Sequence, residues 1–414
     1  MQLKEKFSYL NPLQGFARSL LGLATFILLY INDLNVIFIQ DSYSNEFIQK
    51  NIIKDINLFY IFGFTYSKII SLIILFFVII GYKPRYFYFL HLWVSFSFVN
   101  ACKFIEGGDQ INYLITLFLC PLVLIDKRKW HWFTQNQKYE GNFRNFFSNE
   151  ISFLILILIS IQAFIFYFHA SVGKLFVPDW VNGEALYYWF NDSFFGSPKY
   201  LKYFINTVID NDYVIVFLTY GVLVFELLLA VCIFMPIQYK SIFCFLGILF
   251  HFSIAIIHGL PAFFLNVSAF LILYTLDYRV LKNYSNIIYK KWENKYSDNY
   301  NVYYDGNCGI CKIFISKFVN INNSYFKINF IPLFDNSINE IKINSEKDKM
   351  IFFNGALGIN FLLSISSKKL FFIIVIIEKL YFPLIIEKFF YRIFAKNRNI
   401  ISKIINIKSC SIKD

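Results

Sequence analysis

The stretch that decides how this chain is organised is Val-Tyr-Tyr-Asp-Gly-Asn-Cys-Gly-Ile-Cys, residues 302–311. A short β-like run ends at the turn dipeptide Asp305-Gly306, and Cys308 and Cys311 open a segment whose apolar residues recur at helical spacing. Cys308 is therefore expected at a helix N-terminus, where unpaired amides and the helix dipole favour a thiolate. Cys311 follows one turn later, close enough for a disulfide. Such a pair exchanges electrons with another dithiol, and we expect Cys308 to attack and Cys311 to resolve the mixed disulfide.

The rest of the chain has the composition of a membrane protein. Of its 414 residues, 57% are hydrophobic and only 16% are charged, and the mean hydropathy is +0.52. A water-soluble fold of this size would not easily hide so much apolar surface. The net charge of +12 is of the kind that orients a membrane protein and meets anionic lipid, so membrane lipid is an expected partner and nucleic acid is not. Seven cysteines are too few for a disulfide scaffold.

About eight apolar runs approach the roughly 20 residues that cross a bilayer. They cover residues 16–38, 58–81, 86–104, 111–125, 151–172, 213–235, 241–258 and 261–277. Lysine and arginine gather in every second connection between them, and acidic residues gather in the others. By the positive-inside rule this pattern gives one consistent orientation, with both ends of the chain in the cytoplasm.

The chain changes character near residue 300. It divides into a membrane part, a polar linker and a small domain, at residues 1–282, 283–299 and 300–414. In the last part a strand runs into the Cys-x-x-Cys helix, apolar runs at 326–333 and 350–353 are typical of strands, and residues 357–394 have a mostly helical pattern. The sequence therefore predicts an α-helical polytopic membrane bundle followed by a small thioredoxin-like α/β domain.

Polar residues gather at the end of the fifth apolar run. His169 and Lys174 end this run, and Trp180 follows shortly after. Taken singly, a lysine at a membrane edge is an anchor that reaches for the interface, and a tryptophan belongs to the aromatic belt. Taken together, the three residues form a candidate site, because a partly desolvated lysine has a lowered pKa and can act as a base.

Two further ionisable residues lie inside later apolar runs, Glu226 in the sixth and His251 in the seventh. An ionisable group inside the membrane marks a functional site by default, although tyrosines or backbone carbonyls can also satisfy it. Glu226 has two candidate partners, Lys174 and His251, and the sequence does not decide between them. No metal site is predicted, because the five histidines are scattered and none lies beside the cysteine pair to complete four zinc ligands.

The membrane part also carries a long pattern of residues at Asn11-Pro12, 15–21, 167–171, Lys174-Leu175, Trp180, 183–190 and Phe195-Gly196. Over about residues 8–280 this pattern resembles the sporulation-delaying protein B family. That family belongs to the horizontally transferred transmembrane (HTTM) domain group, which is similar to vitamin K-dependent γ-glutamyl carboxylase. The carboxylase has a comparable Lys-Leu, Trp and Gly sequence, and a Phe-His that resembles Phe250-His251.

The carboxylase resemblance implies roles for particular residues. Lys174 is the candidate catalytic base, and a quinone is the candidate cofactor. The candidate residues for binding a substrate or cofactor are His169, Trp180, Gly183, Glu226 and His251.

The last part of the chain carries a second pattern, at residues 304–311 and again at residues 391–398. Both segments resemble the DCC (DUF393) family of thiol–disulfide oxidoreductases. This resemblance implies that Cys308 and Cys311 are a redox-active disulfide pair.

Together the two resemblances imply a maturation factor for a secreted antimicrobial peptide toxin, in a bacterial inner (cytoplasmic) membrane. Its expected partners are the toxin precursor and a small protein of the same system. Two alternatives stay open: a quinone-linked γ-carboxylase-like enzyme whose thiol domain recycles the cofactor, and a non-catalytic immunity or export-assisting protein. Eight spans would place the cysteine pair in the reducing cytoplasm, so either one span is miscounted or the domain reduces its substrate.

Overall fold

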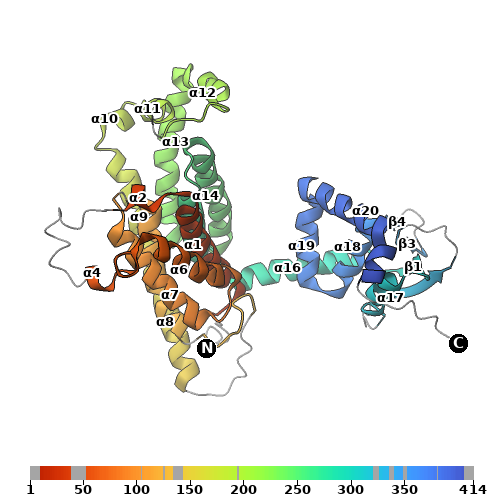
Figure 1. The fold of residues 1–414 in the computed structure, drawn as a ribbon. Coiled ribbons are helices and arrows are strands. Elements are labelled where there is room, and N and C mark those ends of the chain that lie inside the picture. Colours follow the sequence, from red (N-terminus) through yellow and green to blue (C-terminus); the bar gives the residue numbers. More distant parts are fainter. Residues whose placement is uncertain are drawn as a thin grey trace. The chain divides into compact units, whose positions relative to one another are not determined.

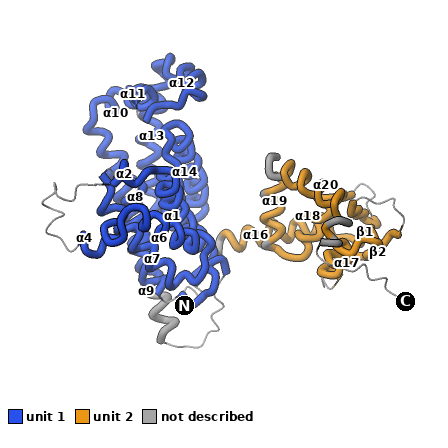
Figure 2. Tube along the Cα trace, viewed as in Figure 1, with its two compact units in different colours: residues 1–280 blue, residues 281–414 orange. Residues whose placement is uncertain are grey.

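The computed structural model describes residues 10–38, 53–103, 105–124, 126–133, 143–193, 195–319, 326–334, 340–347, 352–379 and 381–404. The chain forms two compact units, Met1–Val280 and Leu281–Asp414, which Figure 2 colours separately. The first unit is built from helices, and the second from a small sheet with helices around it (Figure 1).

Unit 1 has a bundle of long helices and several short ones in the connections. In chain order these are α1 (Pro12–Ile31), α2 (Leu34–Ile37), α4 (Ile53–Ile56), α5 (Leu58–Ile61), α6 (Gly63–Ile80), α7 (Pro84–Ala101), α8 (Gly107–Leu124), α9 (Phe143–Lys174), α10 (Pro178–Val181), α11 (Ala185–Asn191), α12 (Lys202–Ile209), α13 (Asp212–Val231), the 3-10 turn η2 (Cys232–Phe234), α14 (Ile237–His258) and α15 (Pro261–Thr275).

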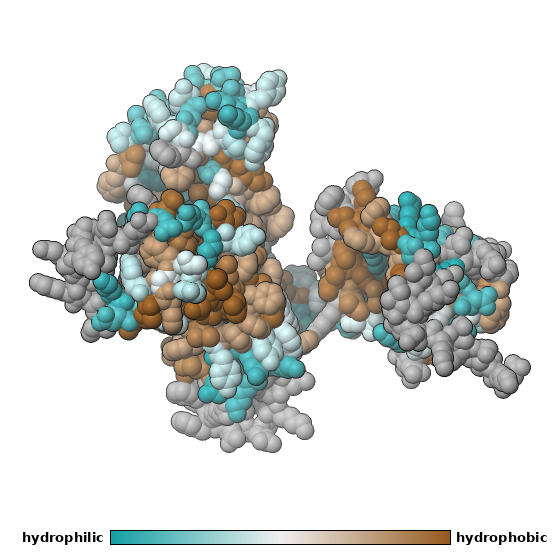
Figure 3. Space-filling model, in the orientation of Figure 1, coloured by the Kyte–Doolittle hydropathy of each residue, from teal (hydrophilic) through white to brown (hydrophobic). Residues whose placement is uncertain are grey.

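Six helices within the described residues are long and apolar enough to cross a bilayer: α1, α6, α8, Ile151–Lys174 of α9, α13 with its 3-10 extension, and α14. Figure 3 shows apolar side chains over the middle of unit 1 and hydrophilic ones at its two ends, the distribution expected of a body surrounded by lipid. The chain is a multi-pass membrane protein.

The sequence predicts about eight spans, and the two remaining runs form α7 and α15. Helix α15 has 15 residues, fewer than the roughly 20 that cross a bilayer. Helix α7 has 18 residues but includes Arg85, His91 and Asn100, and it falls outside the six. The count of eight therefore stays a prediction.

Helix α15 lies at the centre of unit 1. It packs against α1, α8, α9 and α14, and Val267, Ala269, Phe270 and Leu271 have no exposed surface. Successive residues of a helix point about 100° apart, so consecutive buried residues require neighbours on every side. Asn266 of the same helix accepts a hydrogen bond from Asn112 of α8 at 2.8 Å, which satisfies one polar group inside the bundle.

A buried ion cluster joins α1 to the segment that follows α8. Arg18 has no exposed surface, and its guanidinium lies 3.1 Å from the Asp126 carboxylate, which also pairs with Arg128 at 2.7 Å. Burial alone would raise the pKa of Asp126, but the hydrogen bond from Arg128 and the charges of both arginines hold it below its ordinary value. Because each charge has a partner, the cluster can exist away from water.

Unit 2 contains a mixed four-stranded sheet and its surrounding helices. The elements are α16 (Tyr278–Lys295), β1 (Asn299–Asp305), α17 (Gly309–Ser316), β2 (Lys327–Leu333), β3 (Lys342–Ser345), β4 (Phe352–Asn354), α18 (Gly355–Ser366), α19 (Lys368–Lys379) and α20 (Tyr381–Ile404). The strand order is β2-β1-β3-β4. Strands β1 and β2 are parallel, whereas β3 runs antiparallel to both β1 and β4.

The core of unit 2 extends into the segment that the sequence assigns to a linker. Residues 283–299 lie mostly in α16, and Trp292 of this helix packs against the core that includes Tyr300, Val302 and Phe361. The Trp292 ring lies 4.9 Å from the ring of Phe371 in α19. The segment is polar on one face only, so it forms an amphipathic helix that is part of the fold.

Candidate functional site

The candidate redox site lies where strand β1 turns into helix α17. The Asp305 carboxylate at the end of β1 accepts a hydrogen bond from the Asn307 N–H at 2.8 Å. The N–H of Gly306 donates to the carbonyl of Leu333, the last residue of β2, also at 2.8 Å. Both hydrogen bonds fix the turn that delivers the cysteine pair to the start of the helix.

Cys308 caps helix α17 with its sulfur, at the helix N-terminus where the sequence predicts it. The Sγ atom accepts a hydrogen bond from the Cys311 N–H at 3.3 Å. A hydrogen bond from the Cys311 thiol, together with that N–H and the positive charge of Arg398, lowers the pKa of Cys308 from 9.0 to about 6, although burial and Asp305 oppose the change. The same hydrogen bond and burial raise the pKa of Cys311. The reduced pair therefore holds a thiolate on Cys308 and a proton on Cys311.

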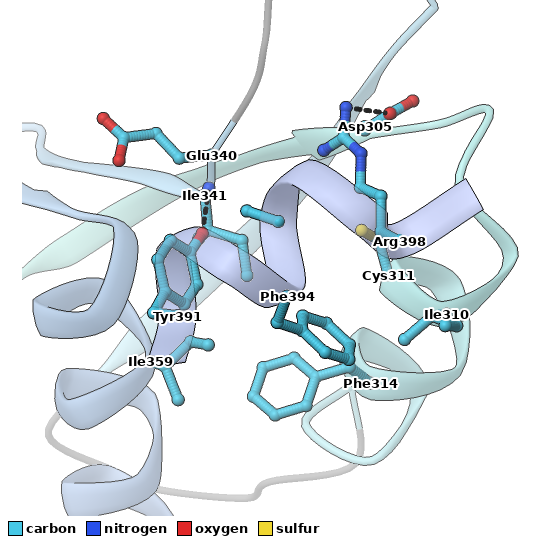
Figure 4. A pocket seen from close by; sticks show the side chains of 11 residues that line it. Asp305, Ile310, Cys311, Phe314, Glu340, Ile341, Ile359, Tyr391, Phe394 and Arg398 are labelled. Carbon is cyan, nitrogen blue, oxygen red and sulfur yellow. Dashed lines mark hydrogen bonds and ion pairs between the residues drawn. The ribbon is translucent and has the colours of Figure 1, made fainter. Parts of the chain in front are cut away.

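A pocket of about 90 Å³ opens beside Cys311. Its lining comes from the end of β1, from α17, α18 and α20, and from the segment before β3 (Figure 4). The apolar members are Ile310, Phe314, Ile341, Ile359, Phe394 and Ala395, and the polar members are Cys311, Asp305, Glu340, Tyr391 and Arg398. Cys308 does not line this pocket, and only 2% of its surface is exposed. The sequence predicts that Cys308 attacks the substrate. In the structure, however, Cys311 is the cysteine that lines the pocket.

Helix α20 closes the site from the far end of the chain. Arg398 pairs with Asp305 at 2.8 Å, and the Tyr391 hydroxyl accepts a hydrogen bond from the Ile341 N–H at 3.3 Å; Figure 4 shows both contacts. Tyr391 and Arg398 lie in the 391–398 segment, for which the sequence indicates a family resemblance but predicts no role in the site. Only the tertiary fold brings them to the cysteines.

A second cluster of predicted residues lies in unit 1. The Nζ atom of Lys174, the last residue of α9, is 2.6 Å from the Glu226 carboxylate in α13. It also donates to the Ala170 carbonyl at 3.0 Å and lies 5.2 Å from the centre of the Trp180 ring. Of the two pairings that the sequence left open, the structure contains Glu226–Lys174. The lysine is held by a carboxylate, an arrangement that suits anchoring or recognition better than proton abstraction.

Three other predicted residues have distinct environments. His251 is buried, its Nδ1 donates to the Gly247 carbonyl at 2.7 Å, and its ring lies 6.1 Å from that of Tyr167. Gly183 has a φ of +82°, and a Cβ at this position would lie 3.1 Å from the Val216 side chain. The backbone conformation and the close approach to α13 therefore both favour glycine at this position. His169 is exposed, and no hydrogen bond among the described residues joins it to Lys174.

Comparison with known proteins identifies the family. The chain is 34% identical to the sporulation-delaying protein SdpB of Bacillus subtilis (strain 168) over 239 residues, which are 56% of this chain and 72% of SdpB. The chain belongs to the SdpB family. It is also 28% identical over 265 residues to the uncharacterized protein YitO of the same organism, covering 63% of this chain and 84% of YitO. No family model and no solved structure matches the chain.

These findings confirm the resemblance of this SdpB-family protein to sporulation-delaying protein B. They leave more than a third of the chain unmatched in each case. The HTTM and DCC resemblances stay predictions, as do the roles of the candidate site residues.

The first prediction concerns the charge state of Cys308. In the reduced full-length protein, ultraviolet thiolate absorbance should titrate with a midpoint near pH 6, and this step should be missing from Cys308→Ser. Arg398→Gln should move the midpoint upward by about one pH unit, since it removes a positive charge, whereas Arg398→Lys should largely preserve it.

The same thiolate links pH to stability. The pKa of Cys308 is lower in the folded protein than its ordinary value of 9.0, so the reduced fold gains stability as the pH rises from about 6 toward 9 and loses it as the pH falls through 6. A midpoint near 9 in the unaltered protein would contradict the assignment.

Proposed function

We propose that this SdpB-family protein is a membrane-bound maturation factor for a secreted peptide toxin, and that its second unit is a thioredoxin-like thiol–disulfide oxidoreductase of the DCC type. The redox part of the proposal rests on the position of Cys308 as the N-cap of α17. Its sulfur accepts a hydrogen bond from Cys311, and the positive charge of Arg398 lies nearby. Helix termini and nearby cations are the settings in which cysteines become reactive thiolates.

The topology around the pair supports the thioredoxin-like assignment. Strands β1 and β2 are parallel, and α17 lies between them in the chain, which makes a β-α-β unit with the Cys-x-x-Cys pair at the start of its helix. This combination is the one expected of a thioredoxin-like redox domain.

The toxin-related part of the proposal rests on family membership. SdpB is named a sporulation-delaying protein, and we infer that this chain serves a comparable system, with a peptide precursor and a small partner protein. The Lys174–Glu226 pair and buried His251 make the adjoining region of α9, α13 and α14 the proposed binding site for the precursor or a quinone-like lipid. We do not propose carboxylation, because the Glu226 carboxylate occupies the amine that such a reaction requires as a base.

We place the protein in the bacterial inner membrane with the second unit in the cytoplasm, from the distribution of lysine and arginine among the connections. In that reducing compartment the pair is expected to act as a reductant, which keeps precursor cysteines free until export. In either direction two electrons pass between the cysteine pair and one substrate disulfide.

The second prediction tests the proposed function in cells. The full-length protein is co-expressed with a cysteine-containing secreted precursor encoded beside it, and the released peptide is analysed by mass spectrometry and toxicity. Cys308→Ser and Cys311→Ser should each lower the yield of correctly bonded peptide by about tenfold or more, since one cysteine cannot complete the exchange.

Cys120→Ser, which removes a thiol of α8 outside the proposed site, is the matched control and should leave the yield unchanged. Lys174→Met should lower the yield without changing the thiol state of the peptide that is released. Full yield of active, correctly bonded peptide from a chain lacking both Cys308 and Cys311 would favour the non-catalytic alternative.

A further inference from the structure

Helix α20 has an apolar stripe on its outer face, the side that points away from the rest of unit 2. The stripe consists of Ile385, Ile386, Phe389, Phe390 and Ile393, and each of these residues is between 39% and 64% exposed. Successive residues of a helix point about 100° apart, so these five positions fall within one sector of the helix. Figure 3 shows apolar side chains gathered over the part of unit 2 where Figure 1 labels α19 and α20. An exposed apolar patch of this kind marks a surface that a membrane or another molecule covers.

The inner face of α20 is occupied by unit 2 itself. The helix contacts α17, α18 and α19, and Tyr391 and Arg398 line the pocket beside the cysteine pair. Arg398 forms an ion pair with Asp305 at 2.8 Å. Glu387, the single acidic residue in the sequence of α20, accepts a hydrogen bond from the Asn360 side chain of α18 at 3.2 Å. The acidic group of this helix is therefore turned inward, away from the stripe.

Three basic residues border the stripe. Lys388, Arg392 and Lys396 are exposed, and because they recur every fourth residue they share one side of the helix. With Glu387 turned inward, the charge beside the stripe is positive. An apolar stripe with lysine and arginine along its edge complements a surface that is both apolar and negatively charged, which is the interface of an anionic bilayer.

Helix α20 is not suited to cross the bilayer. Its 24 residues would be long enough to span, but six of them are charged, and the helix is not among the six candidate spans of the described residues. One face is also packed within unit 2. A helix with one apolar face and one basic edge lies in the plane of the interface instead.

The chain keeps unit 2 near a membrane. Helix α15 of the membrane unit ends at Thr275, and α16 begins at Tyr278. Trp292 of α16 packs against the core of unit 2. A connection this short gives unit 2 a high effective concentration of membrane surface, so a contact that would be weak between separate molecules is populated.

We propose that the outer face of α20 lies on the surface of an anionic lipid bilayer. The apolar stripe enters the boundary between head groups and acyl chains, and Lys388, Arg392 and Lys396 meet the lipid phosphates. This contact goes beyond the proposed thiol–disulfide function and does not depend on it. Because the inner face of the same helix lines the pocket beside the cysteine pair, the contact holds this pocket near the membrane surface.

The third prediction is tested by photo-crosslinking the full-length protein in nanodiscs. Benzoylphenylalanine replaces Phe389 in one sample and Ser316, an exposed residue of α17, in the control. In nanodiscs of phosphatidylcholine and phosphatidylglycerol in equal parts, position 389 should give phospholipid adducts several-fold above position 316. Adducts at position 389 should decrease in pure phosphatidylcholine, because the negative charge that attracts the basic residues is missing.

The crosslinking products distinguish the possible occupants of the stripe. Crosslinks from position 389 to a second copy, to a peptide, or to residues 1–280 of the same chain would overturn the inference. So would lipid adducts no more abundant than those at position 316.

The fourth prediction concerns the basic residues beside the stripe. In the protein that carries benzoylphenylalanine at position 389, Lys388→Gln, Arg392→Gln and Lys396→Gln are combined. In the mixed-lipid nanodiscs this variant should give about one third or less of the adducts of its parent, since three attractions to lipid phosphate are lost.

A matched variant removes the same charge elsewhere in unit 2. Lys317→Gln, Lys327→Gln and Lys347→Gln alter three exposed lysines outside α20, and the adducts at position 389 should stay close to those of the parent. Equal adduct yields from the two triple variants would overturn the assignment of these basic residues to anionic lipid. Both experiments read lipid contact alone, so their failure would leave the proposed thiol–disulfide function standing.

Discussion

The geometry of unit 2 depends on how the chain begins one short helix. The free N–H groups at the start of α17 need an acceptor, and the sulfur of Cys308 supplies it through the hydrogen bond from Cys311. The Asp305–Arg398 ion pair then ties this helix start to α20, the last helix of the described residues. The sheet, the cysteine pair and α20 therefore meet at one point. The pocket lies where these elements meet.

In unit 1, polar side chains lie inside a body that is surrounded by lipid, where they need partners. Arg18 is paired with Asp126, Lys174 with Glu226, and Asn112 with Asn266. Each pair joins segments that are far apart in sequence, so the same contacts that satisfy buried polar atoms also hold the bundle together. A buried charge in unit 1 can therefore serve packing alone. Such a charge is evidence for catalysis only once its partner has been identified.

The sequence predicted features that depend on local pattern and missed those that depend on packing. Cys308 at a helix start and strands near 326–333 and 350–353 follow from turn residues and apolar runs, and the structure contains β2 and β4 there. Strand β3, Lys342–Ser345, has four residues and no apolar run, so only its pairing with β1 and β4 makes it a strand. The Arg398 contact with Asp305 and the orientation of Cys311 toward the pocket likewise arise only when distant segments meet.

The account as a whole depends on residues 308 and 311 cycling between dithiol and disulfide. The most direct measurement is an equilibrium titration of the full-length protein in nanodiscs against glutathione buffers of graded composition, with alkylation and mass spectrometry at each point. The account predicts a single transition in which Cys308 and Cys311 become linked to each other, while the buried thiols of Cys232 and Cys244 are alkylated only after unfolding. If Cys308 and Cys311 remained separate thiols at every composition, the redox function would be contradicted.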